Sequence, residues 1–347
     1  MKKMKKLKMG IIGVGGIAEG RHIPSYLALQ EKVEITAVQD IRGKRAKEVA
    51  EKYDIPFVFE DYQSLFEVVD AVTICTPNKF HSRIAVAALE AGCHVICEKP
   101  MAMNASECEV MLEAAQKANK QLAIAYHYRF MPQSRLAKQA VQEIGEPLVT
   151  RIQALRRRKV PGWGVFTNKE LQGGGSLIDY GCHLIDLALW LLDSPEPVEV
   201  IGRTYNRLSR SPEQINDWGN FDHKSFEVDD HVTAYITFKD GSSILFETSW
   251  AANIKEDHTH LSISGTEAGL NVFPYEFYQP KHGTFMTTTA SVTEDKNFGL
   301  LQAENFVDSC LGDAELVVKP EEAMKVTRIM DAIYESSETG KSVRLGE

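Results

Sequence analysis

Two short groups of residues have the types and the spacing that chemistry requires. The first is Glu98-Lys99-Pro100, which follows the apolar residues 94–97. If those residues form a buried parallel strand, Lys99 lies at its carboxyl end, where open α/β sheets bind ligands. Pro100 fixes its own φ and so stiffens the turn after the lysine. The tripeptide alone also fits a surface lysine at an ordinary turn, so its interpretation depends on the surrounding elements.

The second group is Asp179 and His183. The apolar spacing over residues 177–192 predicts a helix with Ser176 as its N-cap. Asp179 and His183 then lie one turn apart on the same face, and a carboxylate beside an imidazole can orient the ring and raise its pKa, as a general base requires. The alternative is an exposed helix pair worth about 0.2–0.5 kcal/mol. Gly181, inside the same helix, suggests that another element approaches closely.

A glycine-rich turn near the start of the chain predicts a dinucleotide site. Residues 7–12 form an apolar strand pattern that runs into Gly13-x-Gly15-x-x-Ala18. Gly13 permits the tight turn, Gly15 lets the backbone approach a pyrophosphate, and Ala18 allows close packing of helix on strand. Main-chain amides at the helix start then face the phosphates. The contacts predicted for this turn come from Gly13, Gly15, Gly16 and Ile17.

Asp40 strengthens this prediction because it ends the next strand pattern, residues 33–38, and follows Ala18 at the spacing of the acid that binds adenosine ribose hydroxyls. Its alternative role is to cap a helix over residues 44–53. A carboxylate here accepts hydrogen bonds from the ribose diol and repels a 2′-phosphate, which predicts NAD as the preferred cofactor. Arg42, two residues later, leaves NADP possible.

Strand and helix patterns continue to alternate as far as residue 126, which predicts a parallel, doubly wound sheet. The strand pattern 70–75 ends in Thr76-Pro77-Asn78, and a helix pattern follows from about residue 80. Asn78 and His81 flank the carboxyl end of that strand, so they can reach a nicotinamide ribose. Capping of the helix by Asn78 is an equally good interpretation.

The remainder of the chain, residues 127–347, has a different pattern. Helices are predicted over residues 132–143, 300–311 and 320–339, and strands over 147–158, 198–205, 231–238, 243–250 and 261–264. Asp240-Gly241 indicates a tight hairpin between two of these strands. The pattern of residues 127–347 predicts an α+β domain with a large, mostly antiparallel open sheet. The polar loop 209–227, which contains Trp218 and Phe221, is too long to be a simple connection. We therefore predict a Rossmann domain over 1–126 and a substrate-binding and oligomerisation domain over 127–347, with the helix 320–339 packed back on the first.

Composition limits the functional class. The chain has 347 residues, of which 44% are hydrophobic. Its net charge of −9 argues against nucleic-acid binding. The lysine-rich start lacks the apolar run of an export signal, and no stretch is long enough to span a bilayer. The six cysteines lack the close pairing of zinc or redox sites, so we expect a reduced, cytoplasmic protein. His258 and His260 lack a third ligand nearby, and we predict no metal site.

Taken together, these motifs resemble the glucose–fructose oxidoreductase and inositol dehydrogenase (Gfo/Idh/MocA) family over nearly the whole chain. The resemblance rests on the glycine turn, Thr76-Pro77-Asn78-x-x-His81, Glu98-Lys99-Pro100, Arg129, and Gly173-Gly174-Gly175 with Asp179-x-Gly181-x-His183. It implies a Rossmann domain, a C-terminal α/β domain, and oxidation of a ring hydroxyl of a sugar or cyclitol with NAD or NADP. It also implies that Lys99 and His183 are the catalytic pair with Asp179 beside them at the substrate. The further cofactor-binding residues that it implies are Thr76, Asn78, His81, Glu98, Lys99, Arg129 and Trp163.

The resemblance also implies a homodimer or homotetramer built on the C-terminal sheet. The apolar residues of that sheet are too numerous for the predicted helices to cover; they include Val232, Ile236, Ile244 and Phe246. Two other functions fit the same fold. One is a glycosidase that oxidises and re-reduces its substrate with held NAD, and the other is a non-catalytic sensor of sugar or nucleotide. The presence of both Lys99 and His183 favours the enzymes, although a fold by itself does not establish a function.

Overall fold

The computed structural model describes residues 6–291 and 297–346, which form two compact units. The first unit runs to Phe130 and includes the described residues of 297–324, and the second contains the rest. Residues 127–130 and 297–324, which the sequence pattern places in the second domain, thus lie in the first unit. The reason is that the helix after residue 297 contacts the first helix and the first strand of the chain. Where the folding domains divide stays a prediction.

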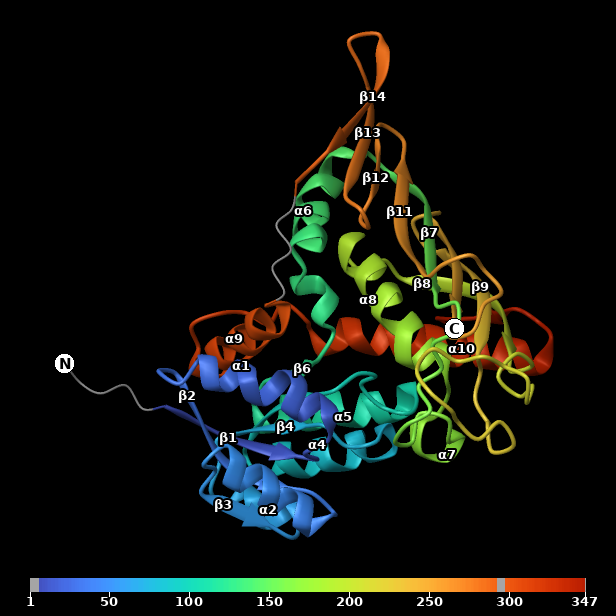
Figure 1. The fold of residues 1–347 in the computed structure, drawn as a ribbon. Helices are drawn as coiled ribbons and strands as arrows, with labels where there is room; N and C mark the ends of the chain where they lie inside the picture. Colours follow the sequence, from blue (N-terminus) through green and yellow to red (C-terminus); the bar gives the residue numbers. More distant parts are fainter. Residues whose placement is uncertain (1–5, 292–296, 347) are drawn as a thin grey trace. The chain divides into compact units, whose positions relative to one another are not determined.

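The first unit is built on a six-stranded sheet in the order β3-β2-β1-β4-β5-β6, with every neighbouring pair parallel. This order places the topological switch between β1 and β4, where such sheets bind ligands. The strands are β1 (Leu7–Ile12), β2 (Val33–Gln39), β3 (Phe57–Phe59), β4 (Ala71–Ile74), β5 (His94–Cys97) and β6 (Leu122–Ile124). The predicted parallel, doubly wound sheet is confirmed (Figure 1).

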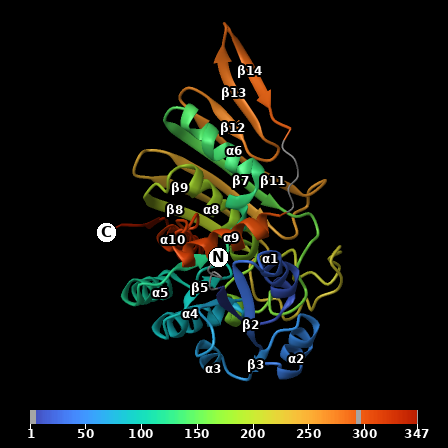
Figure 2. The ribbon, with the colours of Figure 1, turned by 90° about the vertical axis from the view of Figure 1, so that its left-hand side faces the viewer.

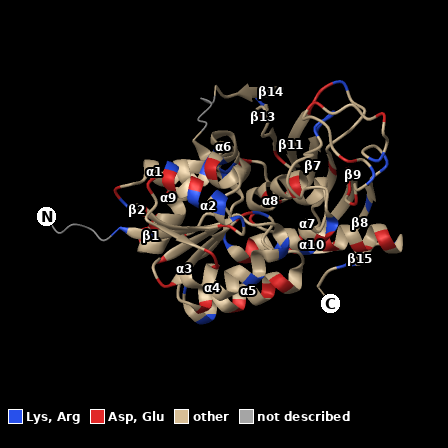
Figure 3. Cartoon of the chain, turned by 60° about the horizontal axis from the view of Figure 1, so that its bottom comes forward, with Lys and Arg blue, Asp and Glu red and all other residues tan. Residues whose placement is uncertain are grey.

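Helices flank this sheet because its central strands are buried on both faces. All four residues of β4 are buried, as are five of the six in β1. The helical segments of this unit are η1 (Ala18–His22), α1 (Ile23–Ala28), α2 (Gly43–Lys52), α3 (Tyr62–Phe66), η2 (Asn78–Phe80), α4 (His81–Glu90), α5 (Ala105–Ala118), η3 (His127–Phe130) and α9 (Phe298–Leu311). Charged residues of both signs occur along these helices (Figure 3). Lys32, just before β2, pairs with Glu304 and Asp308 of α9.

The second unit contains a nine-stranded sheet in the order β14-β13-β12-β11-β7-β10-β9-β8-β15. Among the described strands of this sheet only β7 and β10 pair in parallel, so the predicted, mostly antiparallel sheet is confirmed. Its strands are β7 (Pro147–Leu155), β8 (Pro197–Tyr205), β9 (His231–Phe238), β10 (Ser243–Ser249), β11 (His258–Gly265), β12 (Gly269–Asn271), β13 (Glu276–Lys281), β14 (Thr284–Thr289) and β15 (Val343–Arg344). The hairpin of β13 and β14 projects from one edge (Figure 2).

Helices lie against one face of this sheet. The helical segments of this unit are α6 (Pro132–Ala140), η4 (Val141–Glu143), α7 (Lys169–Gln172), η5 (Leu177–Gly181), α8 (Cys182–Leu191) and α10 (Pro320–Thr339), the last of which begins in the first unit. A Cβ added to Gly181 would lie 2.7 Å from Phe246 Cζ, which confirms the close approach expected at this glycine. No helix among the described residues is apolar over enough length to cross a membrane. None of the six cysteines, all of which lie in the described residues, forms a disulfide.

Burial alternates along β9 and β10, and this alternation corrects our choice of interface residues. Val232, Ile236, Ile244 and Phe246 are all buried, on the face that carries the helices. The opposite face exposes Tyr235 and Leu245 instead. The residues that we named for oligomerisation therefore belong to the core of a single chain.

A buried hydrogen bond joins η1, the helical segment after the glycine-rich turn, to Glu98, which directly follows β5. His22, in η1, lies with its Nε2 2.8 Å from Glu98 Oε1, and both side chains are less than 10% exposed. Burial would raise the pKa of Glu98, but the His22 bond and the charges of His22, Arg21 and Lys99 outweigh it and lower this pKa to about 2. Glu98 therefore stays ionised inside the fold.

We expect Glu98→Gln to destabilise the protein at pH 7 by about 3 kcal/mol, the linkage energy of the lowered pKa. An unfolded glutamate takes up its proton near pH 4.5, whereas folded Glu98 does so only near pH 2. The stabilisation is thus present above about pH 4.5 and is lost as the pH falls toward 2. Thermal unfolding of wild type and variant between pH 7 and pH 3 measures the difference, with the exposed Glu113→Gln as control. A difference that stays constant or widens on acidification would contradict this assignment.

Candidate active site

The glycine-rich turn has the geometry that a dinucleotide phosphate requires. Gly13 has φ +84°, and a Cβ there would lie 2.8 Å from the carbonyl oxygen of Cys75, so only glycine fits. At Gly15 and Gly16 a Cβ would meet no heavy atom within 4 Å, which leaves the backbone accessible. Helical structure begins at Gly16, so its first amides are available to an anion. These residues fit the pyrophosphate of NAD.

Asp40 lies at the carboxyl end of β2 and faces this turn. Its carboxylate accepts hydrogen bonds from the Val14 amide at 3.0 Å and from the Arg42 amide at 2.9 Å. The Arg42 side chain also donates to it, at 3.1 Å. Burial raises the pKa of Asp40, but these bonds from Arg42 and Val14 outweigh burial and lower it. Helix α2 has Arg42, not Asp40, as its N-cap residue, so the capping alternative is wrong.

The loop after β4 contains Thr76, Asn78 and His81. Asn78 is buried in the short turn η2, and α4 has Phe80 as its N-cap residue, so capping by Asn78 is also wrong. The Thr76 hydroxyl is buried and has no hydrogen-bond partner among the described residues. Such a hydroxyl is suited to a bound ribose or amide, because a buried polar group is costly unless it is hydrogen-bonded.

His81 braces two loops. Its ring is wholly buried, with Nδ1 2.9 Å from the Pro100 carbonyl oxygen and Nε2 2.9 Å from that of Thr76. Burial lowers the pKa of His81, although both carbonyl partners favour the charged ring. The contact of His81 with a nicotinamide ribose stays a prediction. The ring holds the turn after Lys99 against the loop after β4.

Arg129 also has a structural position that the sequence did not indicate. Its side chain is fully buried, donates to the Val317 carbonyl oxygen at 3.0 Å and pairs with Glu322. The guanidinium thus holds the segment between α9 and α10 to the first unit. The cofactor contact that the resemblance implies for Arg129 stays a prediction.

The helix that carries Asp179 and His183 begins differently from our prediction. Ser176 makes no capping hydrogen bond, and its hydroxyl donates instead to Asp229 Oδ2 at 2.9 Å. The Asp229 carboxylate caps this end, since it accepts from the amides of Gly175 at 2.8 Å and Leu177 at 2.9 Å. The hydroxyl of Tyr334 in α10 donates to it as well, at 2.7 Å. Sequence reasoning missed Asp229, because its partners are more than fifty residues away.

Asp179 lies in a π-helical turn, a form that often occurs at functional sites. Its Oδ2 accepts from Arg156 Nη1 at 3.2 Å and from the indole Nε1 of the buried Trp250 at 3.0 Å. His183 follows in α8 and is 6% exposed. Orientation of His183 by Asp179 stays a prediction.

The predicted catalytic residues come from both units. Lys99 is half-buried in the first, and Asp179 and His183 lie in the second. Trp163 is in the second unit and 52% exposed, and its place beside a nicotinamide stays a prediction.

His258 and His260 stack on β11 with ring centroids 5.6 Å apart. Among the described residues no group of three His, Cys, Asp or Glu side chains is placed to hold a metal ion.

Comparisons with known proteins match both units. Residues 7–126 match an oxidoreductase family with an NAD-binding Rossmann fold, and residues 138–345 match the C-terminal alpha/beta domain of that family. The chain is 37% identical over 344 residues to the D-glucoside 3-dehydrogenase of Escherichia coli K12, covering 98% of this chain and 97% of the relative. It is 30% identical over 302 residues to the levoglucosan dehydrogenase of Pseudarthrobacter phenanthrenivorans, covering 79% and 75%.

The fold is also that of a solved structure. A levoglucosan dehydrogenase in complex with NADH and levoglucosan superposes with a TM-score of 0.84 at 23% identity, covering 99% of this chain and all of the other. The family models together match most of the chain. The chain therefore belongs to the Gfo/Idh/MocA family of NAD(P)-dependent oxidoreductases.

Proposed function

We propose that this enzyme oxidises a ring hydroxyl of a glucoside or a closely related pyranoside and transfers the hydride to NAD. The observation that supports this most is the setting of Asp179, a carboxylate held by Arg156 and Trp250 one helical turn before the buried His183. The likeness to a D-glucoside 3-dehydrogenase over nearly its whole length supports the substrate class. It makes C3 of the pyranose ring the first carbon to test.

In this proposal, His183 removes the proton from the sugar hydroxyl. An imidazole that is neutral before transfer can hold the proton afterwards near neutral pH. Lys99 donates a hydrogen bond to the same oxygen and stabilises its developing negative charge, which one well-placed donor does by about 3 kcal/mol. When bound, the nicotinamide supplies the hydride acceptor. Asp179 holds the substrate and orients the imidazole.

The basic segment 156–159 supports a neutral sugar rather than a phosphorylated one. Arg156 bonds Asp179, and Arg157 donates to the Lys255 carbonyl oxygen at 3.1 Å. Arg158 donates to the carbonyl oxygens of Ala251 and Ala252, and Lys159 pairs with Asp257. Each of these cations is already bonded to an acceptor within the second unit, so the segment serves the fold.

We expect Lys99→Ala and His183→Ala each to lower kcat by about a hundredfold or more, because each removes a proton-transfer or charge-stabilising group. KM for NAD should change little, and Asp179→Ala should mainly raise the sugar KM and shift the pH profile. Steady-state rates of NADH formation measure these effects. Lys281→Ala and His282→Ala serve as controls; these exposed residues of the same types lie at the end of β13 and in the turn after it. Near wild-type kcat for His183→Ala would place the base elsewhere, with Lys99 the first candidate.

We expect a higher kcat/KM with NAD than with NADP, because ionised Asp40 repels a 2′-phosphate. The Arg42 guanidinium already pairs with Asp40, so it is not free to offset this repulsion. Rates with both cofactors on wild type and on Asp40→Ala test the preference, which the variant should lose. Equal values for the wild type, or an advantage for NADP, would contradict it and assign the 2′-phosphate to Arg42.

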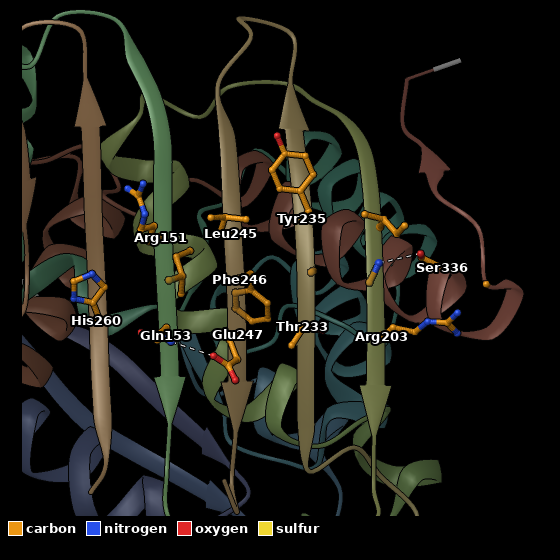
Figure 4. Close-up of a pocket in the computed structure, with 15 residues that line it drawn as sticks. Arg151, Gln153, Arg203, Thr233, Tyr235, Leu245, Phe246, Glu247, His260 and Ser336 are labelled. Carbon is orange, nitrogen blue, oxygen red and sulfur yellow. Dashed lines mark hydrogen bonds between the residues drawn. The ribbon is translucent and has the colours of Figure 1, made fainter. Parts of the chain in front are cut away.

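We also propose a homodimer or homotetramer assembled on the outward face of the second unit's sheet. This face exposes Ile201, Tyr235 and Leu245 by 42–50% and carries a hollow of about 620 Å³ (Figure 4). Polar residues line the same hollow, and Gln153 donates to Glu247 across it at 3.0 Å. An exposed apolar patch with a polar surround is typical of a protein interface.

Light scattering at micromolar concentration should therefore give a multiple of the 38.8 kDa chain mass. The double variant Tyr235→Asp with Leu245→Asp should shift the protein toward monomer, because it places two charges in the proposed interface. The exposed Ile41→Asp, in the first unit, is the control. A wild-type monomer would refute the assembly.

A further inference from the structure

We infer that Trp163 and Trp218 form a second subsite, one that takes the ring of an aglycone when the substrate is a glycoside. Trp163 is 52% and Trp218 39% exposed, and their ring centroids lie 5.3 Å apart at 49°. Phe166 contacts Trp163 edge-on at 6.1 Å. Tryptophan is usually well buried, so two adjacent exposed indoles indicate a binding surface. This inference rests on the proposed oxidation of a glycoside.

Arg156 connects this surface to Asp179. Its guanidinium carbon lies 4.7 Å from the ring centroid of Trp218 and 4.4 Å from that of Tyr180. The same guanidinium donates to Asp179. A single guanidinium group thus separates the indole of Trp218 from the carboxylate that we assign to the sugar. A substituent on a sugar bound at Asp179 can extend across Arg156 onto Trp218.

The surface is held in place before any ligand binds. The Asn216 side chain accepts from the Val160 amide at 2.8 Å and donates to the Val160 carbonyl oxygen at 2.9 Å. The Asp217 amide donates to the Arg158 carbonyl oxygen at 2.8 Å. These bonds join the loop that carries Trp218 to the loop that carries Trp163. A preformed surface avoids the ordering cost that a mobile loop would pay on binding.

The two loops also share an apolar base. A Cβ added to Gly162 would lie 2.6 Å from Phe221 Cβ, so the backbone before Trp163 lies directly on the other loop. Below it, Val160, Phe226 and Trp250 form a buried cluster against which Phe221 packs. Trp250 is the residue whose indole donates to Asp179. The aromatic surface and the sugar-binding carboxylate therefore share one rigid support.

The chemistry of the surface selects an uncharged ring. Indole faces attract the C–H faces of a pyranose and the π-face of an aryl group, and one such contact is worth about 0.5–1.5 kcal/mol. The neighbouring cation is already neutralised by Asp179. We therefore assign the subsite to glucosides whose aglycone is an aryl group or a second pyranose, in preference to free glucose or methyl glucosides.

The test compares kcat/KM for phenyl and methyl glucosides of both anomers, with NAD. In the wild type we expect a phenyl-to-methyl ratio of about 3–10 for the preferred anomer, the factor that one aromatic contact supplies. Trp218→Ala and Trp163→Ala should each bring this ratio toward one. Phe285→Ala, which removes an exposed aromatic ring of β14, should leave the ratio as in the wild type. Circular dichroism checks that each variant is folded. If Trp218→Ala does not fold, Trp218→Leu is used in its place.

Three results would overturn the subsite. One is a wild-type ratio of one. Another is a ratio that both tryptophan variants leave intact while KM for NAD rises, which would place Trp163 at the cofactor. The third is an equal loss of activity on both glucosides. Calorimetric titration of phenyl glucoside without NAD separates this inference from the proposed function. Binding that is weakened in Trp218→Ala supports the subsite even if no glucoside is oxidised. If the wild type does not bind phenyl glucoside, the subsite is overturned.

Discussion

The second unit depends on the buried carboxylate of Asp229. It receives hydrogen bonds from the amides of Gly175 and Leu177 and from the hydroxyls of Ser176 and Tyr334. A Cβ on Gly175 would lie 1.9 Å from the Asp229 carbonyl oxygen, so only glycine allows this approach. One carboxylate thereby ties the helix start to the end of the loop before β9 and to α10. The position of Asp179 and His183 follows from that capped start.

The first unit uses buried polar groups in the same way. Asp40 holds the end of β2 to the glycine turn through the Val14 amide. His81 joins the loop after β4 to the turn after Lys99, and Glu98 joins that turn to His22 in η1. Buried polar groups of this kind are stable only when their bonds are made, which makes them rigid supports. In both units, the residues that support the site are thus distinct from those that we propose act on substrate.

Much of the architecture could be predicted because local patterns determine it. Apolar runs such as residues 71–74 and the helical pattern of 320–339 correspond to observed elements. Strand β14 could not be predicted, because all six of its residues are exposed and they show no apolar alternation. The bonds of Asp229 and Arg129 could not be predicted either, because they join segments far apart in sequence. Ser176 is of a residue type that favours an N-cap, but the buried carboxylate of Asp229 caps the helix instead.

Hydride transfer from a ring carbon of a glucoside to NAD is most directly tested with isotopes. Methyl glucosides that carry deuterium at one ring carbon each would be incubated with the enzyme and NAD, and the NADH formed would be analysed by mass spectrometry. Deuterium should appear in NADH from one labelled position, with C3 the expected one, and the corresponding keto-glucoside should accumulate. NADH without label from every substrate, or no NADH from any of them, would contradict the proposed reaction.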